Sequence, residues 1–349
     1  MTEVNQTSPS PQILIRPRQG RILSLNSWVY AIVVLVALGM IRWLGGGWWF
    51  VSVLLFMPRW LLLVPIMCLA LLCLIQRAFG PLIIQTATAI VVLGPYMGLS
   101  LPIVKFARSI PSGDRIRLVT YNLGMTPLSV NSLVTWLEAR KIDVVCFQEG
   151  GRGEDAVRKA LREAGWHSSK SRTVVSRHPI LSEMPPLADA WESEGRFGAT
   201  LERVRLKSQS GVEFVVASVH LPTIRPGLER LIRLRNPAGL KRQIEWWRTQ
   251  LGRVLSAIAE VNDVPLLLAG DFNMPADDSA LAALQQNFRF AFDEAGWGYG
   301  YTRPTEYPWV RIDHILTAPD CKIISCHVGP DFGSDHLPVW AEIALPRTS

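Results

Sequence analysis

The sequence contains little cysteine: five residues in 349, with no Cys-x-x-Cys pair among them. The absence of such pairs excludes the common zinc-finger patterns and gives no support to a disulfide framework. Cys321 and Cys326 form the one close pair in the polar part of the chain. Their odd separation puts them on opposite faces of a predicted strand, where no disulfide can join them. We therefore expect all five cysteines to be unpaired and buried.

Acidic residues are nearly absent from the first 109 residues, where Glu3 stands against eight Lys or Arg residues. This part alone carries a net charge of +7, which equals the formal charge of the whole chain. The rest of the chain holds 28 of the 36 basic and 28 of the 29 acidic residues, so its net charge is zero. The pI of about 9.4 therefore says nothing about what the C-terminal part binds.

Charged residues are also missing from long apolar runs that follow a polar N-terminal tail, Met1–Ser24. Three runs have about the length that crosses a bilayer: Trp28–Leu44, Trp60–Gln76 and Pro81–Val104. A shorter run, Trp48–Met57, predicts an interfacial or re-entrant segment, with a fourth span as the alternative. We interpret residues 25–108 as a multi-pass membrane region with about three transmembrane helices, and residues 109–349 as a globular domain.

Basic residues that flank these runs give opposing indications of topology. Arg16, Arg18 and Arg21 favour a cytoplasmic N-terminus, and three spans would then place the C-terminal domain outside. A second basic group favours the opposite orientation: Lys105, Arg108, Arg115 and Arg117. We expect a protein of the cell membrane whose globular domain lies on the external face, periplasmic or extracellular.

After Pro111 the sequence changes to short apolar strands and amphipathic helices. Helices are expected at residues 130–140, 154–165, 240–261 and 278–286. Strands are expected at residues 116–122, 144–149, 173–176, 199–206, 212–220, 266–270, 311–317, 322–328 and 339–344. Residues 222–241 are expected to form a basic connection that leads into the long helix, and residues 288–309 to form an aromatic loop. This alternation predicts mixed sheets covered by helices.

Polar side chains interrupt the apolar strands, most of them at a strand's end. Asp271 and Asn273 follow Leu-Leu-Leu-Ala-Gly, a strand buried on both faces; taken alone, this pattern is equally typical of a simple turn. Similar interruptions recur along the chain, at Asn122, Glu149, His220, Asp313 and the Asp335-His336 pair. Because burying such groups unpaired is unfavourable, we expect them to share one polar site.

The ordered set of motifs resembles the endonuclease/exonuclease/phosphatase superfamily of DNase I-like, Mg²⁺-dependent phosphoesterases, from about Arg115 to Leu345. The motifs are Asn122, Gln148-Glu149, Ser218 with His220, Gly-Asp-Phe-Asn at 270–273, Ile-Asp-His at 312–314 and Ser-Asp-His at 334–336. The resemblance implies a four-layer α/β sandwich of two mixed sheets flanked by helices. It leaves the membrane region unmatched, and Gly124 stands where some nucleases of the family carry an acid.

The resemblance also implies roles for these residues. Glu149 would be the principal ligand of Mg²⁺ or Mn²⁺, with Asn122 and Asp335 beside it or joined through water. His336 would be the general base, oriented by Asp313. Asp271 and Asn273 would position water or the leaving group, and His220 would donate to the phosphoryl oxygens or protonate the leaving oxygen.

Substrate contacts are assigned on weaker patterns. Arg225 opens a basic run that would ordinarily be a solvated face, and that alternatively contacts phosphate or anionic lipid. Trp297 and Tyr301, in the aromatic loop, are candidates for stacking on a base or for lying in a lipid interface. His314 and Trp247 are expected to be structural.

Two substrate classes stay open: a nucleic acid and a phospholipid head group. The expected activity is phosphodiester hydrolysis by a membrane-anchored enzyme. A phosphatase acting on a phosphoinositide-like monoester and a catalytically inactive membrane scaffold are the alternatives. Besides the substrate and membrane lipids, the sequence indicates no partner.

Overall fold

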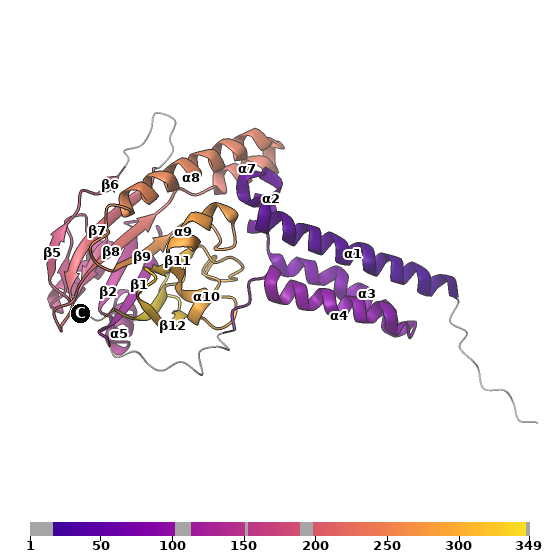
Figure 1. The fold of residues 1–349 in the computed structure, drawn as a ribbon, viewed down its shortest axis with the longest axis horizontal. Helices are drawn as coiled ribbons and strands as arrows, with labels where there is room; N and C mark the ends of the chain where they lie inside the picture. Colours follow the sequence, from indigo (N-terminus) through magenta and orange to yellow (C-terminus); the bar gives the residue numbers. More distant parts are fainter. Residues whose placement is uncertain (1–16, 102–112, 151–152, 189–197, 347–349) are drawn as a thin grey trace, which may run out of the picture. The chain divides into compact units, whose positions relative to one another are not determined.

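The computed structural model describes residues 17–101, 113–150, 153–188 and 198–346 (Figure 1). The chain divides into two compact units, which we name the helical unit and the sandwich unit. The helical unit comprises Met1–Leu38 and Trp60–Tyr96, and the sandwich unit comprises Gly39–Arg59 and Met97–Ser349. Most of the expected tail, together with Lys105 and Arg108, lies outside the described residues.

Apolar helices make up the helical unit: α1 (Pro17–Trp43, whose last turn belongs to the sandwich unit), α3 (Leu63–Ile75) and α4 (Phe79–Val91), which continues as a π-helical turn, η3 (Val92–Tyr96). A 3₁₀ turn, η2 (Arg59–Leu62), precedes α3, and the hydroxyl of Tyr30 donates to the carbonyl of Leu62 at 2.7 Å. Two helices have the length and composition to cross a membrane, Gly20–Trp43 and Phe79–Tyr96. A bent pair, Trp49–Phe56 with Arg59–Ile75, would raise the number to three if it forms one span.

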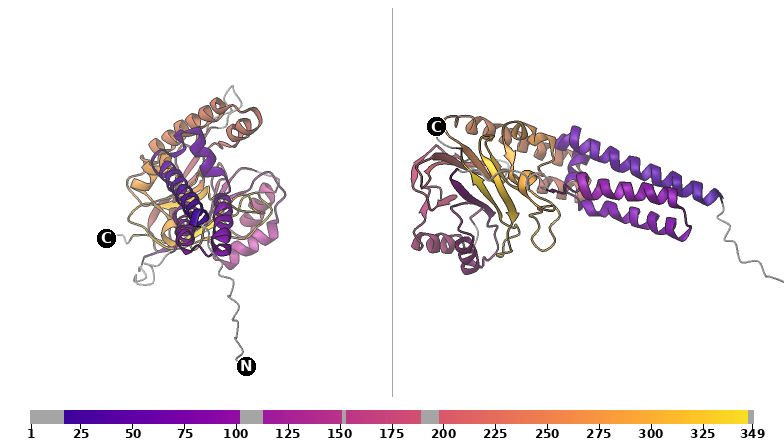
Figure 2. Two further views of the ribbon diagram at one scale, coloured as in Figure 1. Left: turned by 90° about the vertical axis from the view of Figure 1, so that its right-hand side faces the viewer. Right: turned by 60° about the horizontal axis from the view of Figure 1, so that its bottom comes forward.

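Two mixed sheets form the centre of the sandwich unit (Figures 1 and 2). The first has the order β12-β13-β1-β2-β4-β3, with β1 (Arg115–Asn122), β2 (Val144–Gln148), β3 (His167–Ser168), β4 (Val174–Ser176), β12 (Lys322–Val328) and β13 (Val339–Ala344). The second has the order β10-β11-β9-β8-β7-β5, with β6 beside β7. Its strands are β5 (Ile180–Glu183), β6 (Leu187–Ala188), β7 (Thr200–Lys207), β8 (Glu213–His220), β9 (Leu266–Asp271), β10 (Arg289–Phe290) and β11 (Asp313–Thr317). The pairs β1–β2 and β8–β9 are parallel, and the other pairs are antiparallel.

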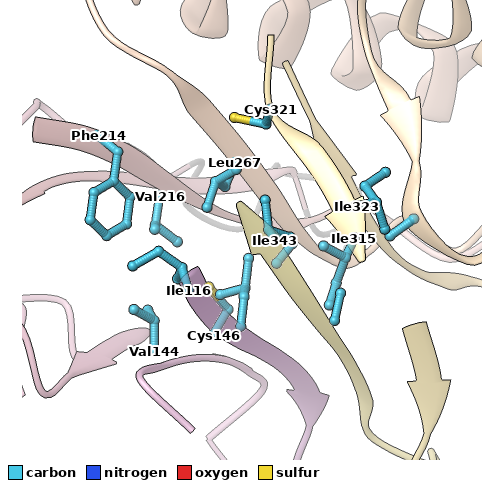
Figure 3. Packing of buried hydrophobic residues seen from close by; sticks show 14 of the residues in the cluster. Ile116, Val144, Cys146, Phe214, Val216, Leu267, Ile315, Cys321, Ile323 and Ile343 are labelled. Atoms are coloured by element: carbon cyan, nitrogen blue, oxygen red, sulfur yellow. The ribbon is translucent and has the colours of Figure 1, made fainter. Parts of the chain in front are cut away.

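The main core lies between the two sheets (Figure 3). Ile116 and Val144 from the first sheet contribute to it, as do Phe214, Val216 and Leu267 from the second. A second cluster packs α5 (Val130–Ala139) and α6 (Glu154–Glu163) onto the first sheet. A third packs α7 (Arg225–Leu234), α8 (Pro237–Ile258) and α9 (Ala282–Asn287) onto the second sheet. This arrangement confirms the predicted four-layer sandwich.

The structure corrects several local predictions. The basic connection contains α7, because Leu228 and Leu231 give its sequence an apolar face that packs against the cluster on α8. The aromatic loop contains β10 and a short helix, α10 (Ala291–Ala295). Cys68 is exposed, so the expectation of burial is wrong for this residue and correct for the other four, which are free and buried.

Residues Gly45–Arg59 pack onto the sandwich, and we call them the strap. They form a 3₁₀ turn, η1 (Gly45–Gly47), and α2 (Trp49–Phe56). The backbone N–H of Gly46 donates to both carboxylate oxygens of Asp278, at 3.1 and 3.2 Å. Arg59 donates to both oxygens of Asp277, at 2.7 and 3.0 Å. The indole of Trp309 donates to the carbonyl of Phe56 at 3.1 Å, so the strap is held at both of its ends.

Candidate active site

Strand pairing brings most of the predicted polar residues to one edge of the sandwich. His220 at the end of β8 pairs with Asp271 at the end of β9, because these strands are parallel. Asp313 begins β11, which is antiparallel to β9, so Asp313 also pairs with Asp271. From the other sheet, β1 ends in Asn122, whose amide nitrogen lies 3.0 Å from Asp271 Oδ2.

A glycine in β9 allows this convergence. A Cβ atom on Gly270 would lie 1.8 Å from the carbonyl oxygen of Val219 in the adjacent strand. Real Cβ atoms essentially never approach backbone so closely, so β8 and β9 can pair here only because residue 270 is glycine. Gly270 therefore fixes the position of Asp271 beside His220.

Asp271 is the buried centre of the site. Its carboxylate accepts from the amide groups of Asn122 at 3.0 Å and Asn273 at 3.2 Å, and from the backbone N–H of Asn273 at 2.8 Å. Burial raises the pKa of Asp271, and the neighbouring charge of Asp313 raises it further. The three donated hydrogen bonds counteract this effect by stabilising the carboxylate.

His336 and Asp313 form a buried pair next to Asp271. His336 Nδ1 lies 2.9 Å from Asp313 Oδ2, so Nδ1 carries a proton and donates it. The other ring nitrogen, Nε2, lies 3.8 Å from Asp271 Oδ2. Although burial disfavours the charged imidazolium, Asp313 and Asp271 outweigh it and raise the pKa of His336 to about 9. Burial opposes ionisation of Asp313 as well, but His336 and a hydrogen bond from Thr302 lower its pKa overall.

Glu149 provides a partly exposed carboxylate beside these buried groups. Its Oε1 accepts from the amide of Asn122 at 3.1 Å and lies 3.6 Å from His220 Nε2, which in turn lies 3.8 Å from Asp271 Oδ2. Ligand atoms of Glu149, His220 and Asp271 all lie within 4.8 Å of one another. So do those of a second group, Asp271, Asp313 and His336.

The donor set fits a hard divalent cation. Glu149 and Asp271 offer carboxylate oxygens, which Mg²⁺ and Mn²⁺ prefer, and the exposed side of Glu149 leaves space for water ligands. Asn122, predicted to lie beside the metal or to be joined to it through water, contacts both carboxylates. It turns its amide nitrogen, which cannot ligate, toward Glu149 and Asp271, while its Oδ1 accepts the N–H of Gly124 at 2.9 Å. As placed, Asn122 holds two carboxylates together.

Two residues of the site have an unusual backbone. Glu149 has φ of 53° and Asn273 has φ of 50°, both in the left-handed region. Asparagine tolerates this region, whereas glutamate rarely adopts it. Such conformations cost on the order of 1–3 kcal/mol and cluster at functional sites. The turn after β2 therefore directs the Glu149 carboxylate toward Asn122 and His220 at an energetic cost.

Asp335 lies at the margin of the site. Its Oδ2 accepts from Arg303 at 2.7 Å, and its Oδ1 lies 2.8 Å from where a Cβ on Gly124 would be. Gly124 has φ of 57°, so both conformation and space explain why it carries no acidic side chain. The structure thus gives Asp335 a guanidinium partner, and it is absent from both candidate metal groups among the described residues.

The three predicted substrate residues are not brought into the cluster. Arg225 is exposed at the start of α7 and pairs with Glu229 at 2.9 Å. Trp297 is exposed. Tyr301 stacks on Tyr299 and donates its hydroxyl to the carbonyl of Met97 at 2.9 Å, and burial raises its pKa to about 12.

Two residues expected to be structural are deeply buried. His314 packs against Phe272 and Phe290, with Nε2 at 2.9 Å from the carbonyl of Met274, and burial lowers its pKa to about 4. Trp247 is fully buried and donates to the carbonyl of Phe272 at 2.9 Å. Both therefore support the backbone on which Asp271 and Asn273 lie.

The sequence analysis missed polar groups around the site. Buried Glu202 accepts from three hydroxyl groups on the segment before β4, those of Ser169, Ser171 and Thr173. Arg303 contacts Asp335, and Thr302 contacts Asp313. Glu202 could have been found as an acidic residue within the alternating strand Thr200–Lys207. Thr302 could have been found from its place in the aromatic loop.

Two mixed sheets flanked by helices, with Asn122, Glu149, His220, Asp271, Asp313 and His336 gathered at one edge, define a DNase I-like protein. The particular family follows from the sequence itself. Residues 119–336 match the profile of the Endonuclease/Exonuclease/phosphatase family, and the chain belongs to this family.

Solved structures of the same fold agree with this assignment. A protein of the endonuclease/exonuclease/phosphatase family from Bacteroides thetaiotaomicron has a TM-score of 0.52 and 15% identity, covering 68% of this chain and 100% of its own. A mannosyl-6-phosphatase from the same organism has a TM-score of 0.51 and 16% identity, covering 66% and 100%. A family member from Bacteroides vulgatus has a TM-score of 0.50 and 17% identity, covering 66% and 99%. At this identity the likeness establishes the fold alone, and no curated protein sequence matches the chain.

Proposed function

We propose that this protein is a membrane-anchored hydrolase that cleaves a phosphodiester with the help of Mg²⁺ or Mn²⁺. The observation that carries the proposal is the buried Asp313–His336 pair, whose free ring nitrogen faces Asp271 next to the partly exposed Glu149. Family membership supports phosphoester hydrolysis as the reaction class.

His336 is the proposed general base. Because Nδ1–H donates to Asp313, the lone pair of neutral His336 is on Nε2, directed to the side where a water would be activated. Asp313 fixes this tautomer and stabilises the imidazolium that forms when the proton is taken up. Asp271 and Asn273 position the water or the leaving oxygen, and His220 donates a hydrogen bond to the phosphoryl oxygens or protonates the leaving oxygen.

Glu149 is the proposed principal metal ligand, and Asp271 lies close enough to share the ion. When bound, the cation offsets negative charge on the phosphoryl oxygens. Asn122 holds the Glu149 and Asp271 carboxylates in register, and Asp335 with Arg303 borders the opening. Asp335 remains a candidate for contact with the metal through water.

A Mg²⁺-dependent assay on the full chain in detergent tests the activity. With bis-p-nitrophenyl phosphate as substrate, His336→Ala and Glu149→Ala should each lower kcat/KM by about 10²–10⁴-fold. His167→Ala and Glu163→Ala, exposed residues away from the site, are the matched controls and should leave it unchanged. Equal activity of the site variants and the controls would refute the mechanism, and absence of turnover in the wild type would favour an inactive scaffold.

A substrate panel separates the open substrate classes. Single-stranded and duplex DNA, RNA, sphingomyelin and phosphoinositides are presented to the wild type and to His336→Ala in parallel. Hydrolysis that depends on His336 identifies the substrate class. Release of inorganic phosphate from a phosphoinositide without cleavage of any diester would contradict the proposed phosphodiesterase activity and favour the phosphatase.

Membrane anchoring rests on the helical unit. In the two candidate spans only 22% of the best apolar window is buried, so most of their apolar side chains would face water in a protein without a membrane. We propose a multi-pass anchor with the sandwich on the external face. A cysteine introduced at exposed Lys159, in a Cys68→Ser background, should react with an impermeant maleimide added to intact cells. Labelling only after lysis would place the sandwich inside.

A further inference from the structure

The helix α7 and the start of α8 carry a concentrated positive charge. From Arg225 to Arg242 the chain has six basic residues and one acid, Glu229, which pairs with Arg225. All six basic residues are exposed: Arg225, Arg230, Arg233, Arg235, Lys241 and Arg242. This charge contrasts with the neutral balance of residues 110–349 as a whole. A surface of this kind attracts anionic groups.

Apolar side chains stand exposed among these arginines. Ile232 is 80% exposed and Leu234 is 70% exposed, whereas Leu228 and Leu231 on the other face of α7 pack against the core. The core contact of α7 is therefore already satisfied by its inner face. We define the α7 surface as Arg230, Ile232, Arg233, Leu234 and Arg235. Basic and aliphatic side chains together are typical of helices that lie in a lipid interface.

The position of α7 in the sandwich unit favours a bilayer as its partner. α7 and the strap both pack against α8, and Figures 1 and 2 show α7 and α2 at the same end of the sandwich. The strap exposes Trp48 and Trp49, a residue type enriched at membrane interfaces. The strap also directly follows the last turn of α1, one of the two candidate spans.

We propose that the α7 surface lies on an anionic phospholipid bilayer, with the arginines on the head groups and Ile232 and Leu234 at the acyl boundary. This inference rests on the membrane anchoring of the proposed function and goes beyond it. Exposed aliphatic side chains favour lipid over nucleic acid, whose backbone offers them no partner. Arg225 begins α7 only five residues after His220, so docking of α7 also holds the loop after β8 near the lipid surface.

Fluorescence of a labelled full chain in nanodiscs tests this inference. In a Cys68→Ser background, Leu234→Cys carries the environment-sensitive probe NBD, and brominated lipids report contact with acyl chains. In discs of phosphatidylcholine with about a third of phosphatidylglycerol, we expect a blue shift and quenching at position 234, stronger than in phosphatidylcholine alone. The triple variant Arg230→Glu, Arg233→Glu, Arg235→Glu should remove both signals.

Two controls make the outcome unambiguous. Charge reversal at three exposed basic residues elsewhere, Lys159, Arg162 and Lys170, should leave the signal at position 234 unchanged. A probe at Val33→Cys in α1 reports insertion itself and should be quenched in every disc.

Quenching at position 33 without any at position 234 overturns the inference and leaves the anchoring intact. No quenching at either position overturns both. A spectral change at position 234 that a single-stranded oligonucleotide produces, and that anionic lipid does not, identifies a nucleic-acid surface and likewise overturns the inference. Hydrolysis of bis-p-nitrophenyl phosphate, measured on the same discs, tests the proposed activity separately.

Discussion

The ion pair between Arg59 of the strap and Asp277 offers a sharp test of how the strap stabilises the sandwich. Replacing Arg59 with alanine leaves the Asp277 carboxylate largely buried without the guanidinium that lowers its pKa. The side chains of Arg59 and Asp277 are only 6% and 17% exposed. Breaking such a pair from one side costs about 3–5 kcal/mol, because the remaining charge is left in a poorly solvated place.

A second pair in the same unit is a matched control. Arg205 donates from Nη2 to both oxygens of Asp263, at 2.9 and 2.7 Å, and from Nη1 to Glu213 at 3.3 Å. Its side chain is 20% exposed, and those of Asp263 and Glu213 are 56% and 41% exposed. Water can solvate Asp263 when its partner is removed, so Arg205→Ala should leave the unfolding temperature nearly unchanged. Both variants therefore remove a guanidinium that donates to carboxylate oxygens at similar distances, in one case from a largely buried acid and in the other from more exposed acids.

Thermal unfolding of the purified full chain in detergent, followed by tryptophan fluorescence, measures the difference. Arg59→Ala should lower the apparent Tm by on the order of 10 °C. The double variant Arg59→Ala, Asp277→Ala should recover part of this loss, because it also removes the stranded charge. Equal shifts for Arg59→Ala and Arg205→Ala, or strict additivity in the double variant, would refute the reasoning.

Three further predictions follow from the site. In Asp313→Asn the pKa of His336 should fall, because the negative charge that raises it is lost. The acidic limb of the kcat/KM profile should therefore move to lower pH, and the maximum should fall. An acidic limb that does not move would contradict the role of Asp313. Gly270→Ala should destabilise the fold by at least about 3 kcal/mol, because the new Cβ would meet the backbone of Val219. Gly252→Ala, which has open space around it in α8, should stabilise the fold slightly. Thermal unfolding compares the two variants. Chelation should abolish hydrolysis and added Mg²⁺ or Mn²⁺ should restore it, whereas activity that persists in the chelator would exclude the metal.

Much of the sandwich was predictable because short stretches of the sequence are enough to identify its strands. Each strand of the centre carries its own apolar run, and the polar residue at its end marks the edge where the site forms. Asp271 and His220 were predicted to meet because both follow buried strands, and parallel pairing places them side by side. The order of the motifs then indicated the family, since no single tripeptide is specific enough to do so.

What the sequence did not reveal depends on contacts between distant segments. Trp48–Met57 reads as apolar whether lipid or protein covers it, and nothing near it in the sequence indicates Asp277 and Asp278 as partners. The start of α7 was not predicted because Pro226 and Gly227 are typical of a loop, whereas here they lie in the first turn of the helix. The hydrogen bond from the hydroxyl of Tyr301 to the carbonyl of Met97 likewise joins segments far apart in sequence, and contact of Tyr301 with substrate stays a prediction.

The strap also limits how this protein can be divided or recombined. In sequence, Gly45–Arg59 lies between apolar helices, so a division near residue 109 would leave it with those helices. In space, the strap donates hydrogen bonds to the carboxylates of Asp277 and Asp278. These two acids follow Asn273 of the site by four and five residues. A sandwich expressed from residue 109 would expose the surface that the strap covers and remove Arg59 from Asp277. Asp278 would lose the N–H of Gly46 and keep that of Ala280. The strap and the sandwich therefore form one structural unit that is discontinuous in sequence.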